Sequence, residues 1–342
     1  MPAKLLVKLL AKSVAKSRPT LTSLAALALV MAGGRLILES GVARAESGTT
    51  LITLGTGGGP LPRADRAQSS NLLVVDGTLY VIDAGDGLTR RIVQAGYDFR
   101  KVGKIFITHP HSDHDNGLAT LINSEWEYQR AEPVDIYGGG VEALVKGALD
   151  YLTPNAEIRW AEGKRRPMAD TFHGHDVGPG VVYQDSNVKV TAVENTHFHF
   201  EAGMPGYGKY HSYSYRFETP SRVVFFTGDT GPSDAVVELA KGADLYVTET
   251  TSADDVIALF KKSGAWDAKT PSEQEGFVRH MHEEHVSPED IGKMAAKAGV
   301  KAVVMTHLGP TVDPKDDYHR YIDEAKKYYS GPITLAKDLM KF

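Results

Sequence analysis

THPHSDHDNG, residues 108–117, holds three histidines and two aspartates and directly follows the apolar run KIFI at 104–107. Such a run predicts a buried strand, and its end then opens into a polar loop. A plain solvated turn would also be polar. It does not account for the alternation of His109, His111 and Asp113 followed at once by His114. Because imidazole and carboxylate groups are the usual ligands of zinc, the stretch predicts a metal-binding loop at a strand end.

The spacing within this loop suits two ions rather than one. Alternate side chains of an extended chain point to the same side, so His109 and His111 face one point beyond the strand, while Asp113 and His114 face a neighbouring point. Zinc needs about four partners, so further donors must come from elsewhere in the chain. Three more predicted strands, at 188–194, 223–226 and 302–305, run into a donor residue, and these donors are His197, Asp229 and His307.

This ordered set of strand-end donors resembles that of the metallo-β-lactamase superfamily of binuclear hydrolases. The resemblance implies an α/β fold, a four-layer αββα sandwich of two similar halves with the metals at one edge. It implies that one ion takes His109, His111 and His197, that the second takes Asp113, His114 and His307, and that Asp229 bridges them. Two Zn²⁺ ions are expected, and Mn²⁺ or Fe²⁺ also suits these nitrogen and oxygen ligands. Such a pair lowers the pKa of a shared water, and the bridging hydroxide attacks the substrate, with Asp113 orienting it.

Other segments are similar to one branch of the superfamily, that of ribonuclease Z and its arylsulfatase-like and phosphodiesterase-like relatives. They are LGTGGGP at 54–60, GDT at 228–230, ETT at 249–251 and HEEHVS at 282–287. In that branch the histidine matching His285 lies near the transferred group, and the resemblance gives it a catalytic role as general acid. β-Lactamases of the superfamily generally lack the bridging aspartate, and one group uses a cysteine. This chain has Asp229 and no cysteine, which disfavours β-lactam hydrolysis.

Several features have two readings at this point. His280, His282 and His285 could instead cap a helix that starts near Pro288. The glycine run 55–59 could bring backbone amides to an anionic substrate or could simply form a turn. The stretch 203–211, GMPGYGKYH, could be a flap over an aryl leaving group or an ordinary surface loop. We expect the remaining histidines, His173, His175 and His199 among them, not to bind metal.

The rest of the chain alternates predicted strands with helical patterns, which is typical of a layered α/β protein. Besides the strands above, strands are expected at 50–54, 71–75, 79–82, 134–137, 212–217 and 245–248. Helices are expected at 86–95, 117–130, 141–151, 233–241, 288–298 and 315–329. No linker divides the chain after residue 49, so residues 46–342 are expected to form one hydrolase domain.

The N-terminus, residues 1–45, has the pattern of a secretory signal peptide. Five basic residues precede the apolar stretch 21–32, and small residues follow at 42–45. The apolar stretch is short of the roughly 20 residues that a membrane span needs, so no stable span is expected after cleavage. This predicts a periplasmic or secreted protein. An uncleaved basic amphipathic helix is the alternative.

The charge balance bears on the partners. Residues 1–45 hold seven of the 38 Lys and Arg and one of the 43 Asp and Glu, which leaves 31 against 42, or a net charge of −11, for residues 46–342. Ribonuclease Z itself acts on tRNA through a basic arm, whereas the one concentrated basic patch here is KRR at 164–166. Because phosphate contacts need clustered Lys and Arg, no nucleic-acid partner is expected.

The sequence therefore predicts an exported binuclear hydrolase that cleaves phosphodiester or aryl sulfate bonds in a small anionic or aryl ester substrate. A lactonase or carboxylesterase on the same ions is the enzymatic alternative, since a hydroxide attacks carbonyl carbon as well. A β-lactamase, a tRNA 3′-processing endonuclease and a non-catalytic metal-binding protein are further alternatives. A homo-oligomer is compatible with the sequence.

Overall fold

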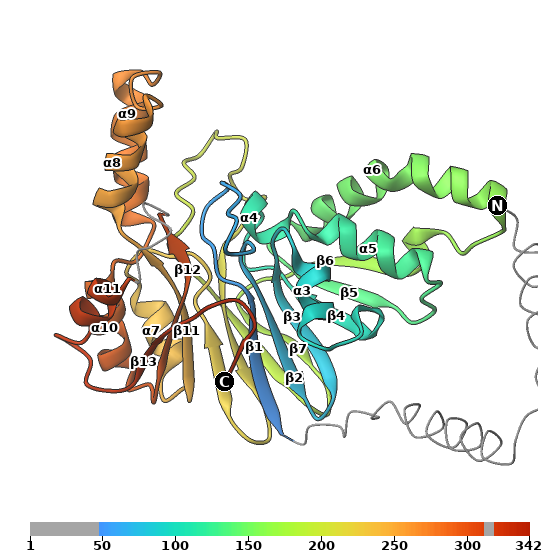
Figure 1. The fold of residues 1–342 in the computed structure, drawn as a ribbon, viewed down its shortest axis with the longest axis horizontal. Coiled ribbons are helices and arrows are strands. Elements are labelled where there is room, and N and C mark those ends of the chain that lie inside the picture. The colour runs from blue at the N-terminus through green and yellow to red at the C-terminus, as the bar shows by residue number, and fades with distance from the viewer. Residues whose placement is uncertain (1–47, 311–317) are drawn as a thin grey trace, which may run out of the picture. The chain divides into compact units, whose positions relative to one another are not determined.

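Two sheets of seven strands each form the centre of the computed structural model (Figure 1). The structure describes residues 48–310 and 318–342. The expected signal peptide, 1–45, and the first residues of the expected helix at 315–329 lie outside the described residues. The strand orders are β14-β1-β2-β3-β4-β5-β6 in the first sheet and β13-β12-β11-β10-β9-β8-β7 in the second.

The strands of the first sheet are β1 (Thr49–Gly55), β2 (Ser70–Val75), β3 (Thr78–Ala84), β4 (Val102–Phe106), β5 (Val134–Gly138), β6 (Phe172–Asp176) and β14 (Met340–Lys341). Those of the second are β7 (Gly180–Gln184), β8 (Lys189–Glu194), β9 (Tyr213–Glu218), β10 (Val223–Phe226), β11 (Leu245–Thr251), β12 (Val303–Gly309) and β13 (Ile333–Leu335).

Both sheets mix antiparallel and parallel pairs in the same way. In the first sheet β1, β2 and β3 pair antiparallel, and β3 to β6 pair parallel. In the second, β7 to β10 pair antiparallel, and β10 to β13 pair parallel. The carboxyl ends of parallel strands meet at one edge of a sheet, which is where open α/β sheets bind ligands. The repeated pattern agrees with the expectation of two similar halves.

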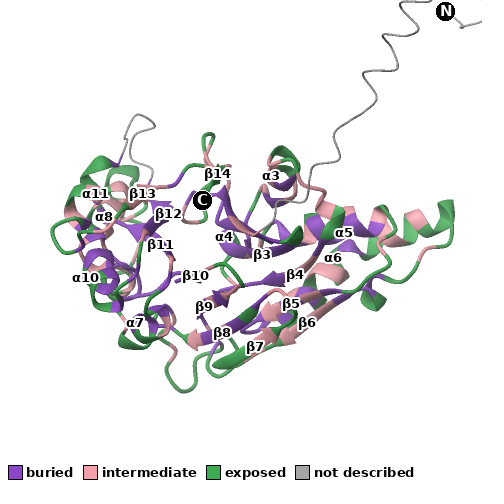
Figure 2. Ribbon diagram, turned by 90° about the horizontal axis from the view of Figure 1, so that it is seen from below, coloured by how far each residue is buried: buried purple, intermediate pink, exposed green. Residues whose placement is uncertain are grey.

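Helices cover the outer faces of the two sheets. The first sheet carries α3 (Leu88–Gln94), α5 (Leu118–Glu127) and α6 (Val141–Glu162), and the second carries α7 (Asp234–Ala240), α10 (Pro288–Ala298) and α11 (His319–Ala325). Three buried apolar clusters lie at the three interfaces between these layers. The middle one, with Phe106, Phe217 and Phe226, joins the sheets. Figure 2 shows the buried residues concentrated on the strands and on parts of the covering helices. The four-layer αββα prediction is confirmed.

Local sequence determines some boundaries closely. Ser287 caps α10, its side chain accepts a hydrogen bond from the amide of Asp290, Pro288 occupies the first turn, and Gly299 ends the helix in the left-handed region. The expected helix at 288–298 is therefore found with those bounds. Ser287, rather than a histidine, provides the cap, so the capping interpretation of His280, His282 and His285 is wrong.

Other elements differ from the expectation. Helix α6 runs through Pro154 to Glu162 instead of ending near residue 151, because a proline removes one backbone donor without ending a helix that is otherwise supported. Strands β6, β7, β13 and β14 were not expected. Three helices were also not expected: the short α4 (Ser112–Asp115), α8 (Ala253–Ser263) and α9 (Pro271–Glu283). Helices α8 and α9 form a pair that projects beyond the sheets in Figure 1.

Helices α8 and α9 contact each other through Phe260 and Phe277, whose ring centroids are 4.5 Å apart. Ser252 and Thr270 cap them, and Gly264 ends α8. Among the described residues, no helix has both the length and the apolar character that crossing a membrane requires.

Candidate metal centre

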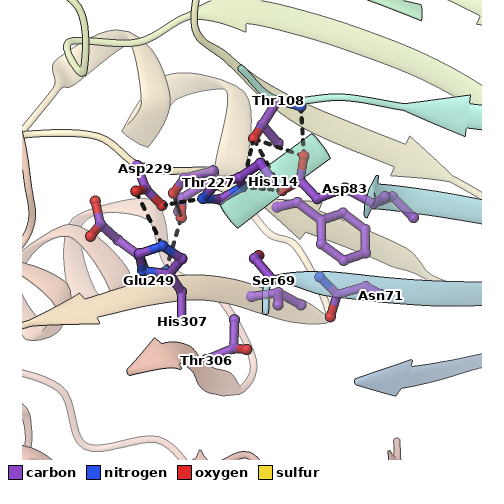
Figure 3. A pocket seen from close by; sticks show the side chains of 14 residues that line it. Ser69, Asn71, Asp83, Thr108, His114, Thr227, Asp229, Glu249, Thr306 and His307 are labelled. Carbon is purple, nitrogen blue, oxygen red and sulfur yellow. Dashed lines mark hydrogen bonds and ion pairs between the residues drawn. The ribbon is translucent and has the colours of Figure 1, made fainter. Parts of the chain in front are cut away.

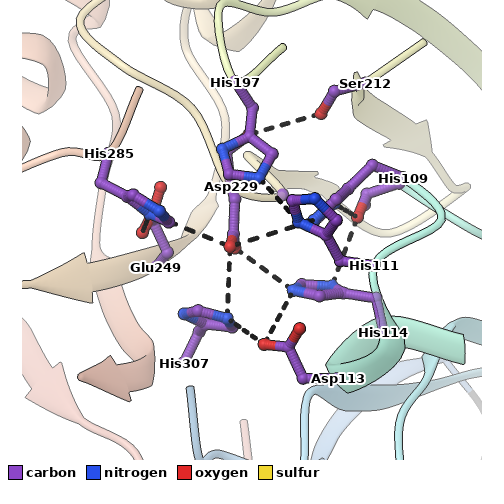
Figure 4. Close-up of polar contacts among 12 residues, drawn as sticks. His109, His111, Asp113, His114, His197, Ser212, Asp229, Glu249, His285 and His307 are labelled. Atoms are coloured by element: carbon purple, nitrogen blue, oxygen red, sulfur yellow. Dashed lines mark hydrogen bonds and ion pairs between the residues drawn. The ribbon is translucent and has the colours of Figure 1, made fainter. Parts of the chain in front are cut away.

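The seven predicted donors lie together at the edge where strands of both sheets end. His109 and His111 follow β4, and the one-turn helix α4 carries Asp113 and His114. From the second sheet, His197 follows β8, Asp229 follows β10, and His307 lies in β12. Figure 4 shows these side chains converging, with Asp229 at the centre.

The first group consists of three imidazoles: His109, His111 and His197. Nδ1 of His111 lies 3.1 Å from Nε2 of His109 and 3.1 Å from Nε2 of His197. His197 donates its Nδ1 hydrogen to the backbone oxygen of Glu284 at 2.9 Å, which leaves Nε2 facing the group. Burial lowers the pKa of all three histidines, far below the ordinary value for His109 and His197. They are therefore neutral, the form in which imidazole binds a metal.

The second group consists of Asp113, His114, Asp229 and His307, all buried. Nε2 of His307 lies 3.0 Å from Oδ2 of Asp113 and 3.3 Å from Oδ2 of Asp229. Nε2 of His114 lies 3.4 Å from Oδ1 of Asp229. Although burial opposes ionisation, His307 and His114 hold the pKa of Asp229 well below its ordinary value. This group therefore carries two carboxylates.

A shell of outer contacts orients the second group (Figure 3). Nδ1 of His114 donates to Oδ2 of Asp83 at 2.8 Å, and Asp83 also accepts hydrogen bonds from the amide and hydroxyl of Thr108. The amide of Gly59 donates to Oδ2 of Asp113 at 2.8 Å. A Cβ atom at Gly58 would lie 2.6 Å from Nδ1 of His307, so only glycine allows the loop to approach this closely.

The glycine run 55–59 was expected either to bring backbone amides to an anionic substrate or to form a turn. Its contacts favour the turn. The amides of Gly57, Gly58 and Gly59 donate to Ala67, Leu308 and Asp113 respectively. The run thus packs against the second group, and these three amides are engaged within the chain.

His285 stands beside both groups. Its Nδ1 donates to Oε2 of Glu249 at 2.7 Å and lies 3.9 Å from Oδ2 of Asp229. Glu249 itself accepts hydrogen bonds from the amide of Thr230 and the hydroxyl of Thr251. Burial works against the charged imidazole, but Glu249 raises the pKa of His285 to about 9. This raised pKa favours the protonated imidazole, the form that can donate a proton.

The donor set fits metal binding. Within each group the ligand atoms lie within 4.8 Å of one another, and His197, Asp229 and His285 form a third such combination. Within the described residues, Nε2 of His114 and Oδ1 of Asp229 are buried, lie 3.4 Å apart and form no hydrogen bond. Buried polar atoms of this kind require a partner, and a divalent cation satisfies several at once. Nitrogen and oxygen donors suit zinc, and they accept manganese or iron as well.

Two residues to which the sequence assigned no role belong to the site: Asp83, and Glu249, which appeared only within the segment ETT at 249–251. Asp83 and Glu249 both lie at the carboxyl ends of strands, β3 and β11. The same pattern of a polar residue after an apolar run marked His197, Asp229 and His307, so this signal could have found them too. A cavity of about 20 Å³ is lined by Asp83 and Glu249 together with His114, Asp229 and His307.

The other histidines are outside the two groups, although the ring of His280 lies 4.9 Å from that of His285. His173 and His175 are on β6, where His175 contacts Asp135 at 2.8 Å. His280 is held by Glu284 at 2.6 Å on α9. Among the described residues, none of these histidines belongs to a group that could hold a metal ion.

Comparison with known proteins agrees with this geometry. The family model described as "Beta-lactamase superfamily domain" matches residues 66–308. A ribonuclease Z of Methanothermobacter thermautotrophicus is 27% identical over 322 residues, covering 82% of this chain and 92% of that protein.

Two solved structures share the fold. The metallo-β-lactamase fold protein YhfI of Bacillus subtilis has a TM-score of 0.62 at 18% identity and covers 86% of this chain and 98% of its own. The short form of human tRNase Z has a TM-score of 0.57 at 21% identity, with coverage of 86% and 98%. The chain therefore belongs to the metallo-β-lactamase superfamily, as a metal-dependent hydrolase with a dinuclear-type His and Asp site that is related to ribonuclease Z.

Proposed function

We propose that this hydrolase cleaves phosphodiester bonds in small substrates. One observation carries the proposal. Asp229 lies within 4.0 Å of donors from both groups, and His285, whose Nδ1 is held by Glu249, lies 3.9 Å from the same carboxylate. A shared carboxylate with a proton donor beside it suits the displacement of an alkoxide or phenoxide from phosphorus.

We assign one ion to His109, His111 and His197, and the other to Asp113, His114 and His307, with Asp229 shared between them. When bound, a pair of divalent ions activates water for attack and stabilises the negative charge that develops on the substrate. The second group brings two carboxylates to its ion, whereas the first brings three neutral imidazoles.

The chain's own groups supply the proton chemistry. His285 donates the proton from Nε2, which lies 3.4 Å from Nε2 of His280, to the leaving oxygen, because its Nδ1 is occupied by Glu249. Asp113 orients the attacking water. The Gly59 amide and His307 both contact its Oδ2, which fixes the direction of this carboxylate.

A substrate panel with measured metal content tests the proposal. It contains bis(4-nitrophenyl) phosphate, 4-nitrophenyl sulfate, an acyl lactone and a carboxylic ester. We expect two metal ions per chain and turnover that is fastest with the phosphodiester. Faster turnover of the sulfate would make the chain a sulfatase, and turnover of the lactone or carboxylic ester alone would make it an esterase. Two bound metals without turnover of any substrate would indicate a metal-binding protein.

RNA is the second candidate substrate, because the relative from Methanothermobacter thermautotrophicus is named ribonuclease Z. The acidic balance of residues 46–342 opposes a large phosphate footprint. Binding that uses many phosphates weakens steeply between about 50 and 200 mM salt. We expect bis(4-nitrophenyl) phosphate to outperform a precursor tRNA at both salt concentrations. Specific cleavage of the precursor tRNA with the higher kcat/KM would make RNA the substrate.

Export through residues 1–45 is also part of the proposal, on the basis of the basic start, the apolar stretch and the small residues that follow. The intact mass of the protein from cell fractions tests it. We expect the mature chain to begin near residue 46 in the exported fraction, and a full-length chain retained in the cytoplasmic fraction contradicts it.

A further inference from the structure

A cleft of about 670 Å³ opens beside the first group, which is within the range of small-molecule sites. His111 and His197 line it together with three separate parts of the chain: the loop after β8, the start of α6 and helix α9. We call it the aromatic cleft. Of the seven proposed ligands, only His111 and His197 reach it, and His111 is the exposed member of the first group.

One wall is aromatic and begins at the histidines themselves. The ring centroid of Phe198 lies 5.2 Å from that of His111 and 5.3 Å from that of His197. Phe200 follows at 5.1 Å from Phe198, and both rings are only half-buried. Met204 and Tyr210, further along the loop, are exposed. Apolar surface thus continues outward from the proposed first ion.

This wall is packed in place. A Cβ atom at Gly206 would lie 2.6 Å from the ring of Phe200, and one at Gly140 would lie 2.5 Å from the ring of Tyr210. Each ring therefore lies directly against a glycine. The amide of Tyr210 also donates to the oxygen of Gly206. The stretch 203–211, for which the sequence left open a flap or an ordinary surface loop, thus forms a packed wall of the cleft.

The opposite wall belongs to α9. Gly276 lines the cleft, and a Cβ atom added there meets nothing within 4 Å, so the helix leaves room at this position. Arg279, one turn further, also lines the cleft and is exposed. Within the described residues it makes no hydrogen bond or ion pair, so its guanidinium is available to a ligand.

We propose that the aromatic cleft binds an aryl group of the substrate that carries a negative charge of its own. The inference rests on the proposed phosphodiesterase function and names its substrate class. The ring of the aryl group lies against Phe198 and Phe200, and Arg279 pairs with its negative charge. Aromatic pairs add about 0.5–1.5 kcal/mol to the burial of apolar area. The planar guanidinium pairs with carboxylate or phosphate through two parallel hydrogen bonds.

Binding of phosphodiesters with and without rings, measured by calorimetry on the zinc-loaded protein, tests the aromatic part. We expect diphenyl phosphate to bind about tenfold more tightly than dimethyl phosphate. Gly276→Leu fills the open space on α9 and should abolish this preference without weakening dimethyl phosphate. Leucine favours a helix more than glycine does, so the variant is not expected to unfold.

Gly147→Leu on α6 is the matched control, because Gly147 also has open space around it and does not line the cleft. It should keep the preference of the unmodified chain. Equal affinity of that chain for the two probes overturns the aromatic assignment. An undiminished preference in Gly276→Leu overturns the location.

The charge assignment has its own probe, 4-carboxyphenyl phenyl phosphate. We expect it to bind more tightly than diphenyl phosphate, and Arg279→Gln should remove the difference. Lys262→Gln, which removes an exposed cation on α8 outside the cleft, should preserve it. If Arg279→Gln retains the difference, the pairing is wrong.

These binding measurements separate the inference from the function on which it rests. Tight binding of the aryl probes without turnover of any phosphodiester contradicts the proposed function and leaves the aryl site standing. Turnover of phosphodiesters with no aryl preference contradicts only the inference.

Discussion

The two halves of the metal centre are built differently. The first group has three neutral imidazoles and one exposed member, His111, whereas the second has two carboxylates and is buried throughout. Besides the shared Asp229, the first ion would have three neutral ligands and the second would also have the carboxylate of Asp113, so the first ion would keep more uncompensated positive charge toward the cleft. The difference suggests a division of roles, in which the first group faces an anionic substrate and the second is a fixed anchor held by Asp83 and the glycine loop.

Asp229 belongs to both halves, and its replacement should have the largest effect. Asp229→Ala removes the carboxylate that contacts His109, His114 and His307. We expect the chain to bind fewer than two ions and kcat/KM to fall by more than the roughly 10²–10⁴-fold that one general acid contributes. Metal analysis and steady-state kinetics measure this, with the exposed Asp254→Ala as control. If the variant kept two ions and its activity, Asp229 would not be shared between the two ions as proposed.

The proton donor beside both halves should matter next. Glu249→Gln weakens the hold on His285, so we expect kcat to fall by about 10²-fold for a substrate with an alkoxide leaving group. The fall should be much smaller for 4-nitrophenoxide, which leaves without a proton. Metal content should stay at two ions. An equal loss for both leaving groups would mean that Glu249 only supports the structure.

Gly58→Ala addresses the anchored half alone. The added Cβ would lie 2.6 Å from Nδ1 of His307 and 2.7 Å from its backbone oxygen, so His307 must move. We expect the affinity for one of the two ions to fall by about 10–100-fold, the usual cost of disturbing a ligand's support. Metal titration should then resolve one tight and one weak site. Gly147→Ala, with open space around it, should bind both ions normally.

The parts of this architecture that short stretches of sequence determine could be predicted. The donors each follow an apolar run, and the Ser287, Pro288 and Gly299 signals mark both ends of α10. Asp83 and Glu249 carry the same strand-end signal, but their roles depend on His114 and His285, which lie 31 and 36 residues away in the chain. Those pairings exist only once the strands are assembled.

The unpredicted elements share a reliance on tertiary contacts. Helices α8 and α9 each bury a single side chain, Ile257 and Met281, and contact each other through Phe260 and Phe277. Strand β6, with the sequence FHGHD, is a polar edge strand. Its histidines and glycine hide the alternation of apolar and polar residues that marks a strand. The aromatic cleft needs the loop after β8, α6 and α9 together, and a linear motif could not reveal it.

The smallest predicted effect concerns the metal-free protein, where the two halves should respond to pH in opposite directions. Burial lowers the pKa of His197. Below about pH 6.5 this imidazole is therefore protonated in the unfolded chain but not in the folded chain, and the free energy of unfolding falls. In His114 burial acts in the same direction, but Asp229, Asp83 and Asp113 outweigh it and raise the pKa. Its contribution to stability is complete below pH 6.5 and is lost as the pH rises through the folded-state pKa.

Urea unfolding with a chelator at pH 5, 6 and 7 therefore distinguishes the halves. Relative to the unmodified chain, His197→Gln should gain stability as the pH falls, by about 1.4 kcal/mol for each unit of pKa difference removed. His114→Gln should be least stable, relative to the unmodified chain, at the acid end of the same range. The exposed His282→Gln is the control for replacing a histidine outside both groups. The carboxylates around His114 are the reason that the pKa values of the two imidazoles shift in opposite directions. If His197→Gln and His114→Gln gave parallel pH profiles, the two groups would not differ in charge.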